Sequence, residues 1–353
     1  MTQSEILLHR QGAIARITLH RPKALNALTM AMIRDLTRHL HELSHDDSVA
    51  AVVFEGAGGR AYCAGGDIRA LHDDLVSRGG FHETFWRQEY ALNALIARYP
   101  KPCVPLMDGI VMGGGVGISA HASHRVVTER TRLAMPEVGL GFIPDVGASW
   151  LLSRSPGELG TFLALTGDTI AAADAITCGL ADYLVPSADL PRLAEALTCL
   201  PAEGNATEGV TRIIAGFARD PGPSPLADHR AAIDEAFAHD SVEPILGAAA
   251  ASTDPFLVEA ARRIATRSPL ALKVTLAMLR RARHLDTVED CLALEFRIGD
   301  RLASAGDFQE GIRAVVVDKD GAPRWNPASL AAVADADVAR YFAPLDKPEL
   351  WHT

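Results

Sequence analysis

The residues that could do chemistry gather between positions 112 and 147. A glycine run, Gly113-Gly114-Gly115-Val116-Gly117, is followed by Glu137 in Met-Pro-Glu and by Asp145 in Phe-Ile-Pro-Asp-Val-Gly. Backbone without Cβ atoms brings its N–H groups close to a ligand. The pattern indicates half of an oxyanion hole with carboxyl groups for acid, base or nucleophilic chemistry.

A second glycine-bearing segment could supply the other half of an oxyanion hole. Residues 61–68 read Ala-Tyr-Cys-Ala-Gly-Gly-Asp-Ile and follow a buried strand expected over 50–55. Two N–H donors from two loops can hold one developing oxyanion. The alternative is an ordinary turn in which Asp67 caps the following helix.

Each of these features also has a structural alternative. Isolated carboxylates are usually solvated, although Glu137 and Asp145 lie among apolar residues, where an ionised group needs a partner or a ligand. The glycines could simply allow close helix packing. Residues 115–120 imitate a dinucleotide fingerprint, but Glu129 follows Gly115 by only 14 positions, too few for the acidic residue of that motif.

Other catalytic motifs do not occur in the sequence. It contains no G-x-S-x-G, no H-E-x-x-H and no G-x-x-x-x-G-K-[ST]. Its five cysteines form no C-x-x-C pair, so no disulfide framework or thiolate zinc site is indicated. Carboxylate chemistry beside backbone donors is what remains.

Composition favours a soluble globular protein that acts on a small molecule. The chain has 353 residues, 48% of them hydrophobic, and a net charge of −10, which argues against a general nucleic-acid or anionic-membrane binder. The N-terminal residues show neither a secretory nor an organellar signal, and no apolar stretch is long enough for a membrane span. We therefore expect a cytoplasmic protein.

The elements that must position these residues alternate in the first half of the chain. Strands are predicted over 13–19, 50–55, 104–107 and 125–128, with helices over 29–43 and 114–122. Thr29 is the expected N-cap of the first helix. The alternation predicts an α/β fold of repeated ββα or βαβ units.

After about residue 150 the pattern becomes mainly helical. Helices are predicted at the five ranges 158–165, 189–199, 255–267, 270–283 and 287–304. The Pro/Gly-rich stretch 220–225 is predicted to be a loop.

Three segments together resemble the crotonase superfamily, the enoyl-CoA hydratase/isomerase fold. They are Arg-Pro-Lys-Ala-Leu-Asn-Ala-Leu at 21–28, Tyr-Cys-Ala-Gly-Gly-Asp-Ile at 62–68, and 109–117. The resemblance implies a crotonase-like spiral of ββα units, with an α/β core over 1–200 that carries the catalytic groups. It also implies a mainly helical C-terminal region over 201–353 that covers the active site.

The resemblance implies specific roles for backbone and side chains. Ala64 and Gly114 match the two positions whose N–H groups hold a thioester oxygen. Hydratases of this superfamily use two glutamates, and the matching positions here are Gly117 and Glu137, so the pair is broken. Without the first glutamate, an ordinary hydratase that positions water with two carboxylates is disfavoured.

The finer pattern is similar to the 3-hydroxyisobutyryl-CoA hydrolase branch of that superfamily. Its motifs are present at 113–117, 135–137 and 142–147, and the likeness continues in the C-terminal half at 268–276, 295–297, 307–314, 318–320 and 323–327. The branch implies hydrolysis of 3-hydroxyisobutyryl-CoA to 3-hydroxyisobutyrate and CoA, in valine catabolism. Glu137 acts there as nucleophile or general base, Asp145 binds the substrate hydroxyl or assists the leaving thiolate, and Glu89 contacts substrate.

The resemblance also implies where coenzyme A binds. The remaining substrate-binding positions are Lys23, Ala24, Gly65, Gly66, Asp67, Arg69 and Gly113, and Lys23 and Arg69 could meet phosphates. Either cation could instead be merely exposed, and Glu89 could be a solvated helix residue. We expect no cofactor or metal beyond the coenzyme A of the substrate, no nucleic-acid or membrane partner, and a possible homo-oligomer. The alternatives are a hydratase or isomerase of the same superfamily and a non-catalytic acyl-CoA-binding protein.

Overall fold

The computed structural model describes residues 4–77, 79–200 and 204–351. Contacts group the chain into two compact units, each built from three segments. Unit 1 comprises Met1–Gly66, Ala91–Leu133 and Ile170–Ser224, and unit 2 comprises Asp67–Tyr90, Ala134–Thr169 and Pro225–Thr353. This grouping by contacts is a different kind of division from the predicted boundary at residue 200, which stays a prediction.

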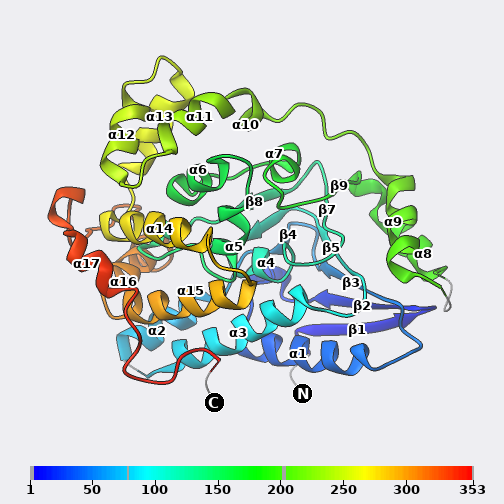
Figure 1. Ribbon diagram of the computed structural model, residues 1–353. Coiled ribbons are helices and arrows are strands. Elements are labelled where there is room, and N and C mark those ends of the chain that lie inside the picture. Colours follow the sequence, from blue (N-terminus) through cyan, green and yellow to red (C-terminus); the bar gives the residue numbers. More distant parts are fainter. Residues whose placement is uncertain (1–3, 78, 201–203, 352–353) are drawn as a thin grey trace. The chain divides into compact units, whose positions relative to one another are not determined.

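Unit 1 is built on a six-stranded sheet in the order β1-β2-β3-β5-β7-β9 (Figure 1). The first two strands pair antiparallel and the others pair parallel. The strands are β1 (Ile6–Gln11), β2 (Ile14–Leu19), β3 (Ala51–Gly56), β5 (Cys103–Met107), β7 (Val126–Val127) and β9 (Tyr183–Leu184). The four predicted strands are confirmed, whereas β1 and the two-residue β9 were not predicted.

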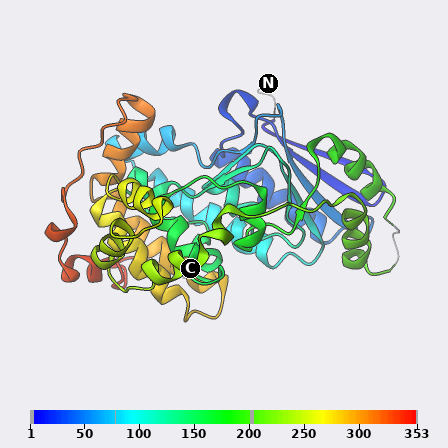
Figure 2. The same cartoon turned by 90° about the horizontal axis from the view of Figure 1, so that it is seen from above.

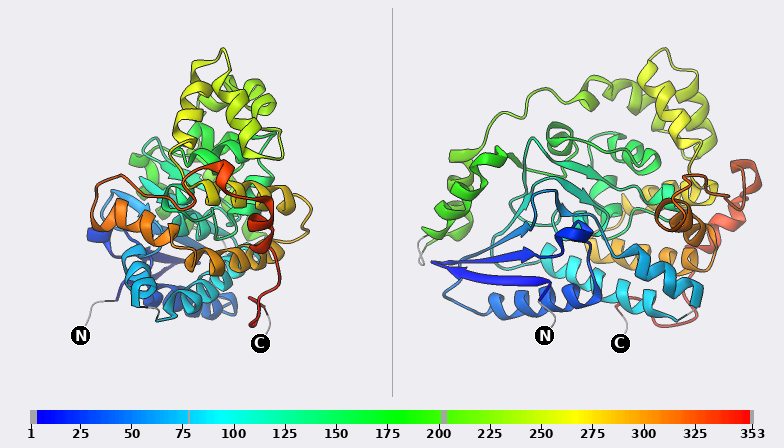
Figure 3. Two further views of the ribbon diagram at one scale, coloured as in Figure 1. Left: turned by 90° about the vertical axis from the view of Figure 1, so that its left-hand side faces the viewer. Right: turned by 180° about the vertical axis from the view of Figure 1, so that it is seen from behind.

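Helices cover both faces of this sheet. Helix α1 (Met30–Ser44) begins after Thr29, whose side chain accepts a hydrogen bond from the Met32 amide as predicted. On the other face, Leu193 of α8 (Leu190–Thr198) and Ile214 of α9 (Ala206–Phe217) pack on the apolar strand residues. Figure 3 shows α1 and the α8–α9 pair on opposite sides of the strands, and Figure 2 shows α8 and α9 side by side.

A smaller sheet places the two glycine-bearing segments. Its order is β4 (Ala61–Cys63), β6 (Ile110–Met112) and β8 (Arg132–Ala134), and β4 pairs parallel with β6. Because neighbouring parallel strands point the same way, the segments that follow β4 and β6 leave at one edge. The helix predicted over 114–122 is shorter: α4 spans only Gly114–Gly117, in keeping with the low helix propensity of its three glycines.

Unit 2 is mainly helical, as predicted for the second half of the chain. Four of the five predicted helices correspond to α6 (Leu159–Thr166), α13 (Pro255–Ile264), α14 (Pro269–Ala282) and α15 (Val288–Ala303), and the fifth, over 189–199, corresponds to α8 in unit 1. Helices α11 (Arg230–Phe237), α12 (Val242–Ala250) and α13 lie together, and α14 contacts α5 (Ala148–Ser153) and α6 (Figure 1). Further elements are α2 (Ile68–Ser77), the first part of α3 (Phe81–Ala97), η2 (Glu137–Leu140), α10 (Pro225–Asp228), α16 (Asp307–Ile312), η4 (Arg313–Val317), η5 (Leu330–Ala332) and α17 (Asp335–Arg340).

Remaining elements of unit 1 are η1 (Pro22–Ala24), α7 (Ala172–Thr177) and η3 (Ser187–Asp189). Residues 220–224 form no helix or strand, so the predicted loop is confirmed up to Ser224, and α10 begins at Pro225. Within the described part of the chain, none of the helices combines the length and apolar character needed to cross a membrane.

Candidate active site

The two glycine-bearing segments lie against each other in unit 1. Gly65 has a φ of +103°, and a Cβ built there would lie 3.2 Å from the Met112 carbonyl oxygen and 3.6 Å from the Gly114 nitrogen. A Cβ on Gly115 would lie 2.2 Å from the Cys63 carbonyl oxygen. Only glycine allows this approach, so the predicted pairing of the two segments is a consequence of these residues.

Two amides at this edge are available to a ligand. Gly114 is the first residue of α4, so its N–H has no acceptor within the helix. The Ala64 amide, in contrast, donates to the Leu25 carbonyl at 3.1 Å. The Gly66 amide donates to no acceptor among the described residues. The geometry therefore favours Gly66 over Ala64 as the donor from the first segment, because Ala64 would have to give up an existing bond.

Asn26 orders the segment that carries Lys23 and Ala24. Its buried side chain donates to the Ala57 and Ala61 carbonyls at 3.0 and 2.9 Å and accepts from the Arg21 amide at 3.0 Å. This ties residues 21–26 to the start of β4. Lys23 and Ala24 lie exposed in η1, so their assignment to coenzyme A stays a prediction.

Four of the buried carboxyl side chains of unit 2 interact electrostatically with one another: Glu89, Glu137, Asp145 and Glu295. Loss of solvation raises the pKa of all four, to about 6 for Asp145 and to about 8 for Glu295. The charges of the other three raise the pKa of Glu137 further. The solvated alternative is therefore excluded for Glu89, Glu137 and Asp145.

The four carboxyl groups differ in their hydrogen-bond partners. The Tyr90 hydroxyl donates to Asp145 Oδ2 at 2.6 Å and thereby lowers the pKa of Asp145 against the effect of burial. Glu89 Oε1 and Glu137 Oε2 have no hydrogen-bond partner among the described residues. Buried polar atoms are normally paired, so these two oxygens are the ones available to a substrate.

The backbone around Glu137 is held by the C-terminal part of the chain. Glu137 opens η2, and a Cβ on Gly141 would lie 2.5 Å from the Asp307 carbonyl oxygen. A Cβ on Gly311 would lie 2.3 Å from the Leu140 carbonyl oxygen, so α16 packs directly on this turn. The Ser268 amide donates to the Val138 carbonyl at 3.2 Å. Residues far along the chain thus pack on the backbone of the turn that carries Glu137.

Asp307 connects these supports. Its Oδ2 accepts from the Ser268 hydroxyl at 2.6 Å and its Oδ1 accepts from the Asn326 amide at 2.8 Å. The resemblance motifs at 268, 307 and 326 therefore have a structural reason: they brace the turn that carries Glu137.

Asp67 and Arg69 have local partners in unit 2. Asp67 Oδ1 accepts from the Ala70 amide at 3.4 Å, which is the helix-capping alternative, and Arg69 donates to the Val316 carbonyl at 3.2 Å. Their assignment to coenzyme A stays a prediction.

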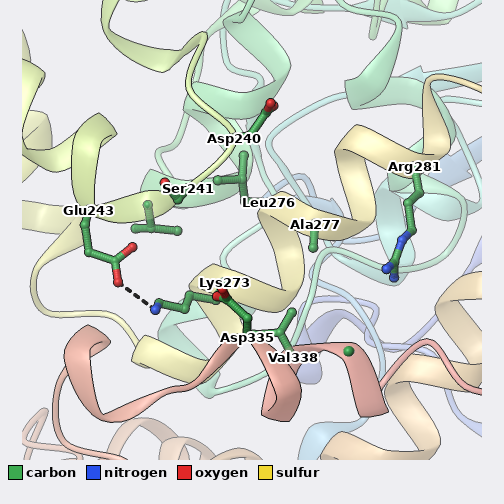
Figure 4. A pocket seen from close by; sticks show the side chains of 11 residues that line it. Asp240, Ser241, Glu243, Lys273, Leu276, Ala277, Arg281, Asp335 and Val338 are labelled. Carbon is green, nitrogen blue, oxygen red and sulfur yellow. Dashed lines mark ion pairs between the residues drawn. The ribbon is translucent and has the colours of Figure 1, made fainter.

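A cavity of about 430 Å³ lies elsewhere in unit 2, between α12, α14 and α17 (Figure 4). Its main charges pair with each other: Lys273 Nζ lies 2.6 Å from Glu243 Oε1 and also donates to the Val333 carbonyl at 2.9 Å. None of the predicted catalytic or substrate-binding residues lines it. This cavity therefore does not support the predicted chemistry.

Two residues of the carboxyl cluster were missed as functional candidates. Tyr90 follows Glu89 directly in α3. Glu295 lies with Leu292, Phe296 and Gly299 on the buried face of α15. A carboxyl at the i+3 position of an apolar helical stripe is the signal that could have found Glu295.

Comparison with known proteins agrees with the resemblance. The family model described as enoyl-CoA hydratase/isomerase matches residues 14–342. A curated relative from Mus musculus, named 3-hydroxyisobutyryl-CoA hydrolase, mitochondrial, is 40% identical over 98% of this chain and 91% of its own length. The protein of the same name from Homo sapiens is 36% identical over 98% of this chain and 90% of its own length.

Two solved structures share the whole fold. One is described as a carnitinyl-CoA dehydratase from Mycobacterium thermoresistibile, with a TM-score of 0.92 and 47% identity, covering 99% of this chain and 98% of that one. The other is described as an enoyl-CoA hydratase from Rhodobacter sphaeroides 2.4.1, with a TM-score of 0.90 and 40% identity, covering 98% of this chain and 99% of that one. The predicted α/β crotonase fold class is confirmed.

One expectation is overturned by these relatives. The cytoplasmic location predicted from the N-terminal residues is wrong by this comparison, because the curated relatives are named as mitochondrial enzymes. The N-terminal pattern was not a sufficient guide to compartment. With a matching family model over most of its length and relatives above one-third identity, the chain belongs to the enoyl-CoA hydratase/isomerase family.

Proposed function

We propose that this chain is an acyl-CoA thioester hydrolase whose substrate is 3-hydroxyisobutyryl-CoA. The products are 3-hydroxyisobutyrate and CoA, a reaction of valine degradation. The observation that carries the proposal is Glu137, a buried carboxyl with an unpartnered oxygen, in a chain that has Gly117 where a hydratase has its first glutamate. The names of the curated relatives support the same reaction.

The thioester carbonyl oxygen is proposed to accept hydrogen bonds from backbone amides of unit 1. Gly114 is one donor, as predicted, and Gly66 is the other, since the Ala64 amide is bonded to Leu25. These donors act where negative charge develops when the carbonyl carbon is attacked. Loss of one such donor typically costs on the order of 3 kcal/mol of transition-state stabilisation.

Glu137 is proposed to bring about hydrolysis of the thioester by water, as a general base or as a nucleophile. As general base it takes a proton from water while the oxygen attacks the carbonyl carbon; as nucleophile it forms a mixed anhydride that water then cleaves. In both routes the C–S bond breaks and the thiolate takes up a proton to leave as CoA. Burial, which raises the pKa of Glu137 well above its usual value, makes the ionised carboxylate a stronger base.

Asp145 and Glu89 are proposed to interact with polar groups of the substrate. Asp145 binds the substrate hydroxyl or assists the thiolate, and its pKa of about 6 allows either protonation state near neutrality. Glu89 contacts substrate through its unpartnered Oε1. No cofactor is proposed beyond the coenzyme A of the substrate, and a homo-oligomer stays a prediction.

A second candidate is hydration or dehydration of a CoA ester. It is favoured by the names of the two solved structures, of which one is 47% identical to this chain. The test is a panel of 3-hydroxyisobutyryl-CoA, other short 3-hydroxyacyl-CoA esters and crotonyl-CoA, followed by mass and by free thiol. Hydrolysis releases CoA thiol from a 3-hydroxyacyl ester. Water added to crotonyl-CoA without thiol release would favour the second candidate, and tight binding without any turnover would favour a non-catalytic acyl-CoA-binding protein.

A further inference from the structure

Glu295 is a fully buried carboxyl on an otherwise apolar face of its helix. Its relative exposure is 0%, and its neighbours on the same face of α15 are Leu292, Phe296 and Gly299. A carboxyl on such a face is costly unless it is fully hydrogen-bonded. Its position therefore calls for a reason beyond packing.

Both oxygens of Glu295 bond to the segment that follows Asp145. Oε2 accepts from the Gly147 amide at 2.7 Å and Oε1 accepts from the Ser149 amide at 2.8 Å. These two N–H bonds favour the ionised form and so lower the pKa of Glu295, while burial raises it to a net value of about 8. The side chain of Glu295, which lies 146 to 148 positions away in sequence, thus binds the backbone that directly follows Asp145.

The segment held in this way has a strained conformation. Val146 has a φ of +56° and Gly147 a φ of +82°, so two successive residues are left-handed. A buried β-branched residue rarely adopts this conformation, and it persists only where the surroundings enforce it. The two bonds from Glu295 supply that enforcement.

The next residue of α15 supports the other partner of Asp145. The Phe296 ring meets the Tyr90 ring edge-on, with centroids 6.4 Å apart and an interplanar angle of 85°. Tyr90 in turn donates to Asp145 Oδ2. Adjacent residues of α15 therefore hold Asp145 from two directions, through its following backbone and through its hydroxyl partner.

We propose that Glu295 is a positioning residue for the proposed hydrolysis, which fixes the left-handed turn after Asp145 and so directs the Asp145 carboxyl. The inference rests on the proposed function for its catalytic consequence but not for its structural one. Glu295 is not assigned any contact with substrate.

The charge of Glu295 should affect the pH dependence of kcat/KM. A purely structural role would leave that pH dependence unchanged. The groups that interact with it are Asp145 and Glu137 from the 137–149 segment, Tyr90 from α3 and Cys291 from its own helix. Its negative charge raises the pKa of Glu137. Because the pKa of Glu295 is about 8, it carries this charge only toward pH 8 and above. Removing the charge is expected to lower the pKa of Glu137 in that range, which moves the acid limb of the kcat/KM profile to lower pH if Glu137 acts ionised.

The test is the Glu295→Gln variant, which keeps the shape but can accept through only one oxygen. We expect kcat to fall by about 10- to 100-fold, as small misplacements of reacting groups do, with KM changed far less. The acid limb should move to lower pH. Backbone hydrogen exchange at Gly147 and Ser149 should become faster.

Glu158→Gln is the matched control. Glu158 is also buried in unit 2, but it accepts from Thr161, Arg280 and Arg283 and is absent from the groups that shift the pKa of Glu137. We expect it to lower Tm while kcat and the acid limb stay as in the wild type. Equal effects of both variants on kcat would overturn the inference.

A double variant covers the case in which Glu295→Gln folds poorly. Glycine adopts a left-handed φ without strain, so Val146→Gly needs less enforcement from Glu295. The loss caused by Glu295→Gln, in kcat and in exchange protection, should therefore be smaller in the Val146→Gly background. Equal losses in both backgrounds would overturn the inference, as would a folded Glu295→Gln with wild-type kcat, acid limb and exchange.

The two proposals can fail separately. If the wild type releases no thiol from any thioester, the proposed function fails, while hydrogen exchange still reports whether Glu295 holds the turn. If Glu137→Gln is inactive and Glu295→Gln matches the wild type in every readout, only the role of Glu295 is overturned.

Discussion

Tyr90 donates its hydroxyl hydrogen to Asp145 Oδ2 at 2.6 Å, and both side chains are buried. The bond stabilises the ionised carboxylate, so it lowers the pKa of Asp145 while burial raises it, to a net value of about 6. Tyr90 itself stays a neutral donor, because burial raises its pKa well above its usual value. This pair sets the protonation of the carboxyl proposed to meet the substrate hydroxyl or the leaving thiolate.

Replacing Tyr90 by Phe removes this donor and keeps the ring. The pKa of Asp145 should then rise above about 6, so any step that needs ionised Asp145 sets in at higher pH. The measurement is kcat/KM for thiol release as a function of pH. Tyr99→Phe is the control, because Tyr99 donates to the Leu40 carbonyl at 2.8 Å within unit 1. An acid limb that is unmoved in Tyr90→Phe would contradict this role.

Stability should depend on pH through Asp145. Its pKa is raised from 3.8 to about 6 by folding, so the protonated form is the one that folding favours. Its contribution to stability is present below pH 4 and is lost as pH rises through 6. Asp145→Asn should therefore gain stability relative to the wild type between pH 4 and 8, by up to about 3 kcal/mol.

Urea unfolding of both proteins at several pH values measures this difference. Asp73→Asn, whose carboxyl is 77% exposed on α2, is the matched control for the loss of a carboxyl group. A difference for Asp145→Asn that is constant or falls with rising pH would contradict the account.

Gly311 should not tolerate a side chain. A Cβ there would lie 2.3 Å from the Leu140 carbonyl oxygen, so Gly311→Ala must push α16 away from the turn that carries Glu137. We expect a loss of about 1–3 kcal/mol of unfolding free energy and a lower kcat. Gly247→Ala, in α12 with no atom within 4 Å of its Cβ, should be neutral or slightly stabilising. Similar unfolding curves and kcat for both variants would show that the packing of α16 on this turn is unimportant.

The sequence predicted the local elements better than the contacts between distant segments. Helix α1 follows from its apolar spacing and from Thr29 as N-cap, and both are local signals. Helix α4 ends after four residues, because its glycines resist helix formation and the chain turns at Ile118. Periodicity alone did not reveal that early end.

The candidate site was predictable in its residue types but not in its hydrogen bonds. The glycine segments, Glu137 and Asp145 stand out in the sequence, and Glu89 is implied by the resemblance. Which amide of the first segment is available depends on the φ of +103° at Gly65 and on the bond from Ala64 to Leu25, and the sequence shows neither. Glu295 was missed because its hydrogen bonds to the segment after Asp145 join residues that are far apart in the sequence.

The most direct test of the central claim is CoA thiol release from 3-hydroxyisobutyryl-CoA by the wild type and by Glu137→Gln. The account predicts steady thiol release by the wild type and its loss, by at least about 100-fold, in a folded variant. The amide is similar in shape, so far-UV circular dichroism should match between the two proteins. Near-normal thiol release by Glu137→Gln would contradict the account, as would a wild type that hydrates crotonyl-CoA and releases no thiol.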